Sequence, residues 1–139
     1  MNKDLSKTLS DIGVNAKRAS EVLNTASSEQ KNSFFDFAIK AIQDDSNAIL
    51  EANKIDIKQA EENNKDAAFI DRLALDKDRI EGICKTLKEI KCFDDPIGKV
   101  LASWNRPNGL KISRVSTPLG VIGLIFESRP EVAADAGGG

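Results

Sequence analysis

The chain has 139 residues, of which 20 are lysine or arginine and 22 are aspartate or glutamate, giving a net charge of -2. This length suits one domain, or one domain and the beginning of a second. The balanced charge predicts neither nucleic acid nor an anionic membrane as a partner, because both attract basic patches. The sequence shows neither a membrane span nor the apolar core of a signal peptide, so we expect a cytoplasmic protein.

Histidine does not occur in the sequence. The chain therefore cannot form a Ser–His or Cys–His nucleophile pair by itself, nor a histidine-ligated metal site, and we expect no metal. The two cysteines are too few for a disulfide framework, and their spacing matches no metal motif. We expect Cys84 to be a buried structural residue on the apolar stripe of a helix and Cys92 to be exposed.

Apolar residues that recur every three or four positions predict successive amphipathic helices in the first hundred residues. The first helix is predicted over residues 5–23. Ser27 and Gln30 have the spacing of a capping box, which predicts the start of a second helix. Further helices are predicted over residues 48–62 and 67–73, and then after the N-cap residue Asp76.

The pattern changes after Lys91. Turn signals at residues 107–109 precede a half-polar strand, which is predicted over residues 110–116. The uninterrupted apolar run at residues 121–126 predicts a strand that is buried on both faces, as in a parallel sheet. The closing glycines 137–139 predict a loop or a frayed end.

Trp104, which lies between the last predicted helix and the turn signals, is predicted to anchor a loop. Gly120 and Gly123 do not form a dinucleotide-binding fingerprint. That fingerprint places its glycines after a strand and before a helix, whereas these two flank or interrupt the predicted strand.

The polar sequence Glu127-Ser128-Arg129-Pro130 follows the predicted buried strand. In open α/β sheets the carboxyl ends of the strands are where ligands bind. Arg129 can hold a phosphate or carboxylate with two parallel hydrogen bonds, and Pro130 would fix the turn that aims it. The alternative is an ordinary loop in which Arg129 pairs with a carboxylate such as Glu131. The sequence leaves both interpretations open.

These residues carry a resemblance to a known family. The chain resembles the N-terminal part of the γ-glutamyl phosphate reductases (glutamate-5-semialdehyde dehydrogenases), which belong to the aldehyde dehydrogenase superfamily. The segment 118–123 is similar to aldehyde dehydrogenases generally, and the ending Phe126 to Pro130 narrows the likeness to this branch. The other similar segments are residues 53–56, 70–75 and 95–110.

The resemblance implies an α/β fold with a Rossmann-type cofactor domain, of which this chain is a mostly α-helical part with one or two β-strands near its C-terminus. Residues 1–109 would be the N-terminal helical part of the cofactor domain, and residues 110–117 a strand of an oligomerisation arm. Residues 118–139 would be the first strand and turn of the cofactor-binding sheet, cut short. The resemblance also implies that the full-length protein is a homo-oligomer.

The implied reaction is the NADPH-dependent reduction of γ-glutamyl phosphate to glutamate-5-semialdehyde in proline biosynthesis. Phe126, Glu127 and Ser128 would border the cofactor, and Arg129 would position the phosphate or stabilise an oxyanion. The family's nucleophilic cysteine lies beyond residue 139, so we expect these residues to be inactive alone. The alternative is a non-catalytic helical interaction module, or the relic of a split or degraded gene.

Three residues depart from the pattern expected for the family. Phe126 stands where a tyrosine is expected, Glu131 where an asparagine is expected and Ala133 where a threonine is expected. Phe126 loses only a hydroxyl group. Glu131 places a carboxylate beside the anion-binding turn, where it would weaken the attraction for phosphate or pair with Arg129.

Overall fold

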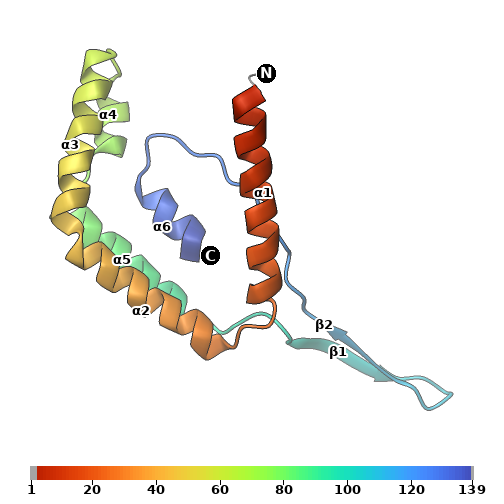
Figure 1. The fold of residues 1–139 in the computed structure, drawn as a ribbon. Helices are drawn as coiled ribbons and strands as arrows, with labels where there is room; N and C mark the ends of the chain where they lie inside the picture. Colours follow the sequence, from red (N-terminus) through yellow and green to blue (C-terminus); the bar gives the residue numbers. More distant parts are fainter. Residues whose placement is uncertain (1–2, 139) are drawn as a thin grey trace. The chain divides into compact units, whose positions relative to one another are not determined.

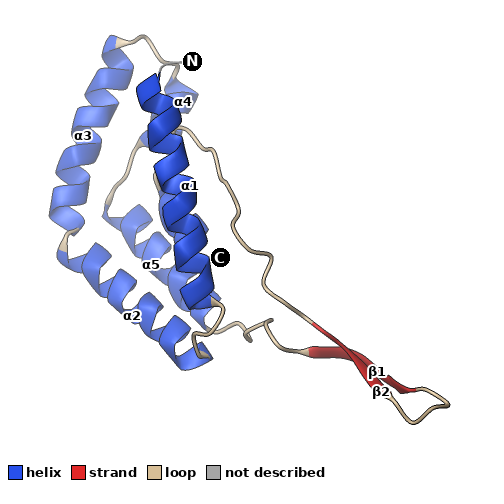
Figure 2. Cartoon of the chain, turned by 45° about the vertical axis from the view of Figure 1, so that its right-hand side comes forward, coloured by secondary structure: helices blue, strands red, loops and turns tan. Residues whose placement is uncertain are grey.

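The computed structural model describes residues 3–138, which form helices and one two-stranded sheet (Figures 1 and 2). They divide into two compact units, residues 3–28 with 94–123 and residues 29–93 with 124–138. The elements, in chain order, are α1 (Lys3–Leu23), α2 (Ser28–Asp44), α3 (Ser46–Glu62), α4 (Ala67–Leu73), α5 (Lys77–Lys91), β1 (Val100–Asn105), β2 (Lys111–Val115) and α6 (Glu131–Gly138).

Helices α1 to α5 lie where the periodicity predicts them. N-cap residues explain where two of these helices, α4 and α5, begin. The Asp66 carboxylate accepts a hydrogen bond from the backbone N–H of Phe69 at 2.6 Å, and Asp76 accepts one from Arg79 at 2.7 Å. Each bond satisfies an N–H group that has no partner within its own helix, and each fixes the first turn.

The core of the second unit lies between α2 and α5. Phe35 and Ile39 from α2 pack there with Cys84 and Leu87 from α5, and the last two are each 2% exposed. Burial of Cys84 confirms its predicted structural role. Burial also raises the pKa of the Cys84 thiol, because the charged thiolate is poorly solvated there.

Helix α6 was not predicted, because its sequence is short and ends in glycines. It forms in a tertiary context in which Ala134 packs against the core between α2 and α5. At Gly138 a side-chain carbon would lie 3.1 Å from both Leu87 and Phe35, so a glycine suits this close approach. The prediction of a loop was therefore wrong for residues 137 and 138, and Gly139 lies outside the described residues.

In the first unit, β1 and β2 form an antiparallel hairpin. Strand β2 confirms the predicted strand at residues 110–116, and the turn signals ahead of it are the hairpin turn, where Gly109 has a φ of 86°. Strand β1 was not predicted. Trp104 belongs to β1 and is paired with Ile112, so its assignment as a loop anchor was wrong.

The predicted strand at residues 121–126 is not a strand in the structure. Ile122 is 69% exposed and Ile125 is fully exposed. A parallel strand needs a neighbouring strand for its backbone hydrogen bonds, and the sheet formed by residues 3–138 contains only β1 and β2. The apolar run has the composition of a buried strand without the partner that would pair with it.

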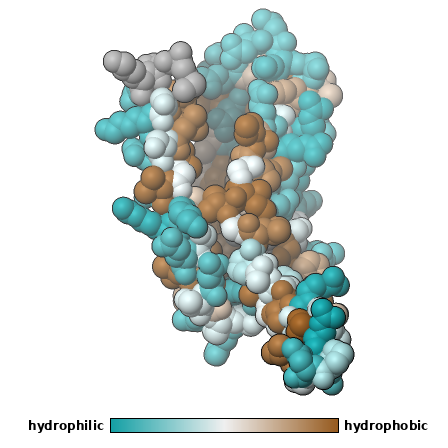
Figure 3. Space-filling model, turned by 90° about the vertical axis from the view of Figure 1, so that its right-hand side faces the viewer, coloured by the Kyte–Doolittle hydropathy of each residue, from teal (hydrophilic) through white to brown (hydrophobic). Residues whose placement is uncertain are grey.

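Apolar side chains are also exposed along α1. Leu5, Leu9 and Ile12 follow one stripe of this helix and are 53%, 56% and 59% exposed. Hydrophobic surface is visible over much of the face drawn in Figure 3. No helix among residues 3–138 is both long and apolar enough to cross a membrane.

Candidate functional site

The polar turn Glu127-Ser128-Arg129-Pro130 links the exposed apolar segment to α6. Ser128 has a φ of 57°, in the left-handed region that residues with a side chain rarely adopt. Among the described residues, Asn64 is the other non-glycine residue with a positive φ. Such conformations cost free energy and often occur at functional sites, so Ser128 identifies this turn as a candidate.

Arg129 is exposed at this turn. Within residues 3–138 its side chain forms no ion pair or hydrogen bond, and it does not pair with Glu131, which was the alternative interpretation. Its backbone carbonyl accepts a hydrogen bond from Val132 at 3.1 Å, which joins the turn to the start of α6. The guanidinium group therefore has no protein partner among the described residues and can bind an anion.

A hollow of about 280 Å³ lies beside this turn within the second unit. It is bounded by one face of α3, by α4 and the turn before it, and by Glu127 with Ser128. On α3, the lining positions recur at intervals of three and four residues, as one helix face requires. The lining residues are Asp56, Gln59, Ala60, Asn63, Lys65, Phe69, Leu73, Glu127 and Ser128.

The hollow carries charges of both signs. Asp56 and Glu127 are exposed carboxylates, whereas Lys65 is exposed with its ammonium nitrogen 4.7 Å from the centre of the Phe69 ring. In the described part of the chain, none of these three charged groups forms an ion pair. Their charges are therefore free to interact with a ligand that is small and polar.

The structure brings together some of the predicted site residues. Glu127 and Ser128 line the hollow, and Arg129 follows them directly. Phe126 is 48% exposed and does not line it. Sequence reasoning missed the contributions of α3 and α4. The resemblance at residues 53–56 included Asp56, but only the folded chain shows that this part lies beside residues 127 and 128.

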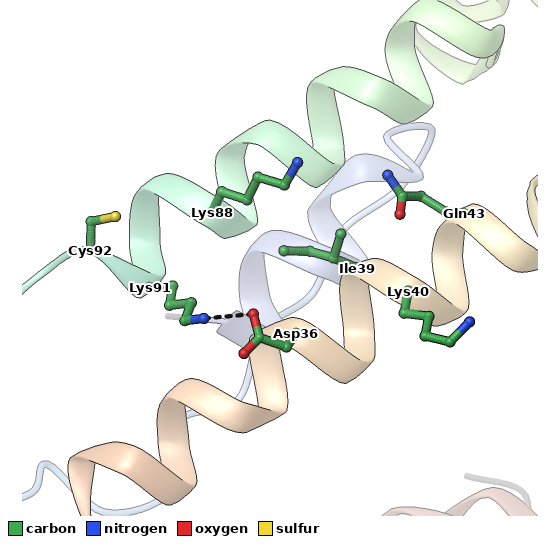
Figure 4. Close-up of a pocket in the computed structure, with 7 residues that line it drawn as sticks. All are labelled: Asp36, Ile39, Lys40, Gln43, Lys88, Lys91 and Cys92. Carbon is green, nitrogen blue, oxygen red and sulfur yellow. Dashed lines mark hydrogen bonds and ion pairs between the residues drawn. The ribbon is translucent and has the colours of Figure 1, made fainter.

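A second hollow, of about 380 Å³, lies between α2 and α5 (Figure 4). Two of its cations already have partners: Lys91 lies 2.6 Å from Asp36, and Lys40 lies 2.6 Å from Asp44. Cys92 lines its margin and is exposed, as predicted. None of the predicted site residues reaches this hollow. The described residues contain no group of three histidine, cysteine, aspartate or glutamate side chains that could hold a metal ion.

Comparison with known proteins points to one family. The chain is 49% identical over 137 residues to the γ-glutamyl phosphate reductase of Brucella suis, covering 99% of this chain and 32% of that protein. It is 51% identical over 127 residues to that of Allorhizobium ampelinum, covering 91% of this chain and 30% of that protein. The chain thus spans about a third of the length of these curated relatives. No protein-family model matches it.

Solved structures give the same result. The match to the crystal structure of γ-glutamyl phosphate reductase from Thermotoga maritima covers 88% of this chain and 30% of that protein chain, with a TM-score of 0.85 and 36% identity. The match to the crystal structure of the Saccharomyces cerevisiae enzyme covers 92% of this chain and 33% of that protein chain, with a TM-score of 0.87 and 36% identity. The mostly helical fold with one antiparallel hairpin is therefore the fold of a corresponding part of these enzymes.

Proposed function

We propose that this chain, which is homologous to the γ-glutamyl phosphate reductases over nearly its whole length, forms part of an enzyme that reduces γ-glutamyl phosphate to glutamate-5-semialdehyde in proline biosynthesis. The observation that carries the proposal is the 49% identity over 137 residues, a span that includes the candidate turn at residues 127–130. In the proposed reaction, this turn would lie at the reacting centre.

In the proposed reaction, a cysteine thiolate attacks the acyl carbon of γ-glutamyl phosphate and phosphate leaves. A hydride then adds to the resulting thioester, the thiolate leaves, and the aldehyde is formed. This thiolate does not come from the cysteines seen here. Cys84 is buried with a raised pKa, and Cys92 lines the hollow between α2 and α5 rather than the one beside Ser128. The nucleophile must therefore come from outside these residues.

Arg129 would bind the phosphoryl group before attack and would stabilise negative charge as phosphate leaves. An arginine suits both tasks, because its planar guanidinium group stays charged and can donate two parallel hydrogen bonds to a phosphate. Its exposure and lack of a protein partner within residues 3–138 support this role. Charged donors held in place before the reaction lower the free energy of a charged transition state.

A nicotinamide cofactor, NADPH in this proposal, would supply the hydride. Phe126, Glu127 and Ser128 would border it, and the half-exposed ring of Phe126 offers an apolar face for that purpose. These residues do not form a dinucleotide site by themselves. Residues 3–138 contain no parallel sheet and no strand–turn–helix unit to hold a pyrophosphate. Most of the cofactor contacts would have to come from elsewhere, and we derive no step from them.

The proposal also divides the chain by role. Residues 1–109 would belong to the helical part of the cofactor domain, except that β1 pairs with β2 and so would join residues 110–117 in an oligomerisation arm. Residues 118–139 would form the first strand and turn of the cofactor sheet once a neighbouring strand is present. The hairpin supports an arm, because its strands β1 and β2 pair only with each other among the described residues. The whole enzyme would be a cytoplasmic homo-oligomer, with neither nucleic acid nor membrane as a partner.

A non-catalytic interaction module is the second candidate. The full exposure of Ile125 favours it, because an apolar segment of this kind is suited to pairing with another chain. This candidate and the reductase differ in whether the complete gene product performs hydride transfer.

The test is the reverse reaction catalysed by the complete gene product. Glutamate-5-semialdehyde, NADP⁺ and inorganic phosphate are supplied, and NADPH is followed by its absorbance. We expect NADPH to form only when both the aldehyde and phosphate are present. A folded gene product that forms no NADPH, or forms it at the same rate without phosphate, would refute the proposed reaction and leave the interaction module as the better account.

A further inference from the structure

We propose that the hollow beside Ser128 binds the α-amino acid end of the substrate, with Asp56 holding the α-ammonium group and Lys65 the α-carboxylate. This inference rests on the proposed function, since it assigns a substrate subsite within the same reaction. It commits the hollow to a zwitterionic amino acid rather than to phosphate, with Glu127 and Ser128 at the edge that would also border the cofactor.

The charges of the hollow support a zwitterion. Asp56, Glu127 and Lys65 line it, and none of the three forms an ion pair within residues 3–138. Two carboxylates beside one ammonium group would repel a dianionic phosphate. An amino acid end presents one positive and one negative group, so both signs of charge find partners. The Gln59 amide adds hydrogen-bonding groups, as does the side-chain oxygen of Asn63, whose amide nitrogen already donates to the Gln59 carbonyl at 2.8 Å.

The apolar part of the hollow suits the methylene groups of a glutamyl chain. Ala60 is 7% exposed, and Phe69 and Leu73 are partly buried at positions one helical turn apart on α4. A volume of about 280 Å³ lies just below the range of roughly 300–1,000 Å³ that is usual for small-molecule sites. It suits one small head group and a short aliphatic chain.

The hollow and Arg129 are adjacent along the chain, as a substrate with two charged ends requires. Ser128 lines the hollow and Arg129 is the next residue, so their Cα atoms are separated by about 3.8 Å. Two methylene groups separate the α-carbon of a glutamyl group from its reacting carbonyl. In this proposal the amino acid end would occupy the hollow while the phosphoryl group would be held by Arg129, the residue after Ser128.

Three dicarboxylate and amine probes test this assignment on the complete gene product by isothermal titration calorimetry. L-Glutamate carries both α-groups, glutarate lacks the ammonium group, and γ-aminobutyrate lacks the α-carboxylate. We expect Asp56→Asn to weaken the binding of L-glutamate and of γ-aminobutyrate about tenfold or more and to leave the binding of glutarate unchanged. Lys65→Met should weaken the binding of L-glutamate and of glutarate by a similar factor and leave the binding of γ-aminobutyrate unchanged. Lys65→Arg should restore most of the lost binding.

Matched controls use charges that do not line the hollow. Lys58 lies on α3 within 4.0 Å of Glu62, and Asp11 is exposed on α1, so Lys58→Met and Asp11→Asn should bind all three probes like the wild type. The inference would be overturned if Asp56→Asn and Lys65→Met weakened the binding of all three probes equally. It would also be overturned if neither variant weakened the binding of any probe.

The activity assay separates this inference from the proposed reaction. Selective binding in the pattern above, without phosphate-dependent formation of NADPH, would uphold the amino acid subsite and refute the reaction. Phosphate-dependent activity combined with variants at Asp56 and Lys65 that bind L-glutamate like the wild type would overturn the subsite alone.

Discussion

The side chain of Asn53 on α3 forms hydrogen bonds with the backbone at the end of α4, at Leu73 and Leu75. Its side-chain nitrogen donates a hydrogen bond to the carbonyl oxygen of Leu73 at 2.8 Å, and its side-chain oxygen accepts one from the N–H of Leu75 at 2.7 Å. Asn53 is 4% exposed, so these bonds are shielded from water. Because Leu73 lines the hollow, this buried amide fixes one wall of the proposed substrate subsite.

Replacing Asn53 should destabilise the protein. Asn53→Ala would leave two backbone polar groups without partners in a partly buried setting, which should lower the free energy of unfolding by about 2–3 kcal/mol. Urea denaturation measures this change. The matched control is Asn47→Ala, an exposed position on the same helix, which should change stability by less than about 0.5 kcal/mol. Similar losses in the two variants would contradict the role of the buried amide.

The two cysteines should differ in reactivity. A thiol reagent should modify exposed Cys92 rapidly in the native protein, whereas Cys84 should react only when the protein unfolds. Mass spectrometry of the labelled peptides distinguishes them. Rapid labelling of Cys84 under native conditions would contradict the packing of α5 against α2.

The raised pKa of Cys84 also predicts a pH dependence. The folded state holds the thiol proton more tightly than the unfolded state, so its contribution to stability is fully present below the ordinary thiol pKa of 9.0. That contribution is lost as the pH rises through the higher pKa of the folded state. Stability measured from pH 7 to pH 10 should fall more steeply for the wild type than for Cys84→Ala. Parallel profiles would contradict this expectation.

Hydrogen exchange should separate the hairpin from the apolar segment that follows it. In residues 1–139 alone, amides paired between β1 and β2, such as those near Trp104 and Ile112, should be protected. Amides of residues 121–126 should exchange at close to the rate of an unstructured chain, because these residues are not hydrogen-bonded to a neighbouring strand in the structure. Protection of residues 121–126 in this chain would show that they form a strand without further sequence.

The sequence predicted the features that depend on nearby residues. Periodicity and the N-cap Asp76 identify α5, and the turn around Gly109 identifies the start of β2. Prediction from the sequence failed where contacts with residues far along the chain decide the local structure. Helix α6 forms against a core supplied by α2 and α5, and for that reason Gly138 lies in a helix rather than in the predicted loop or frayed end.

The candidate site shows the same division. The turn at residues 127–130 could be identified from its polar residues and its resemblance to a known family. The contributions of Asp56 and Lys65 could not, because nothing in their local sequence shows that α3 and α4 lie beside Ser128. The apolar run at residues 121–126 was interpreted from its composition, but a strand also needs a partner.

The most direct test of the account is the phosphate dependence of NADP⁺ reduction in an Arg129→Gln variant of the complete gene product. We predict that the KM for phosphate rises about tenfold or more, as expected for the loss of a charge-assisted contact, and that Arg129→Lys recovers part of it. Arg18→Gln, at an exposed position on α1, should keep the wild-type KM. An unchanged KM for phosphate in Arg129→Gln would contradict the assignment of this turn to the reacting centre.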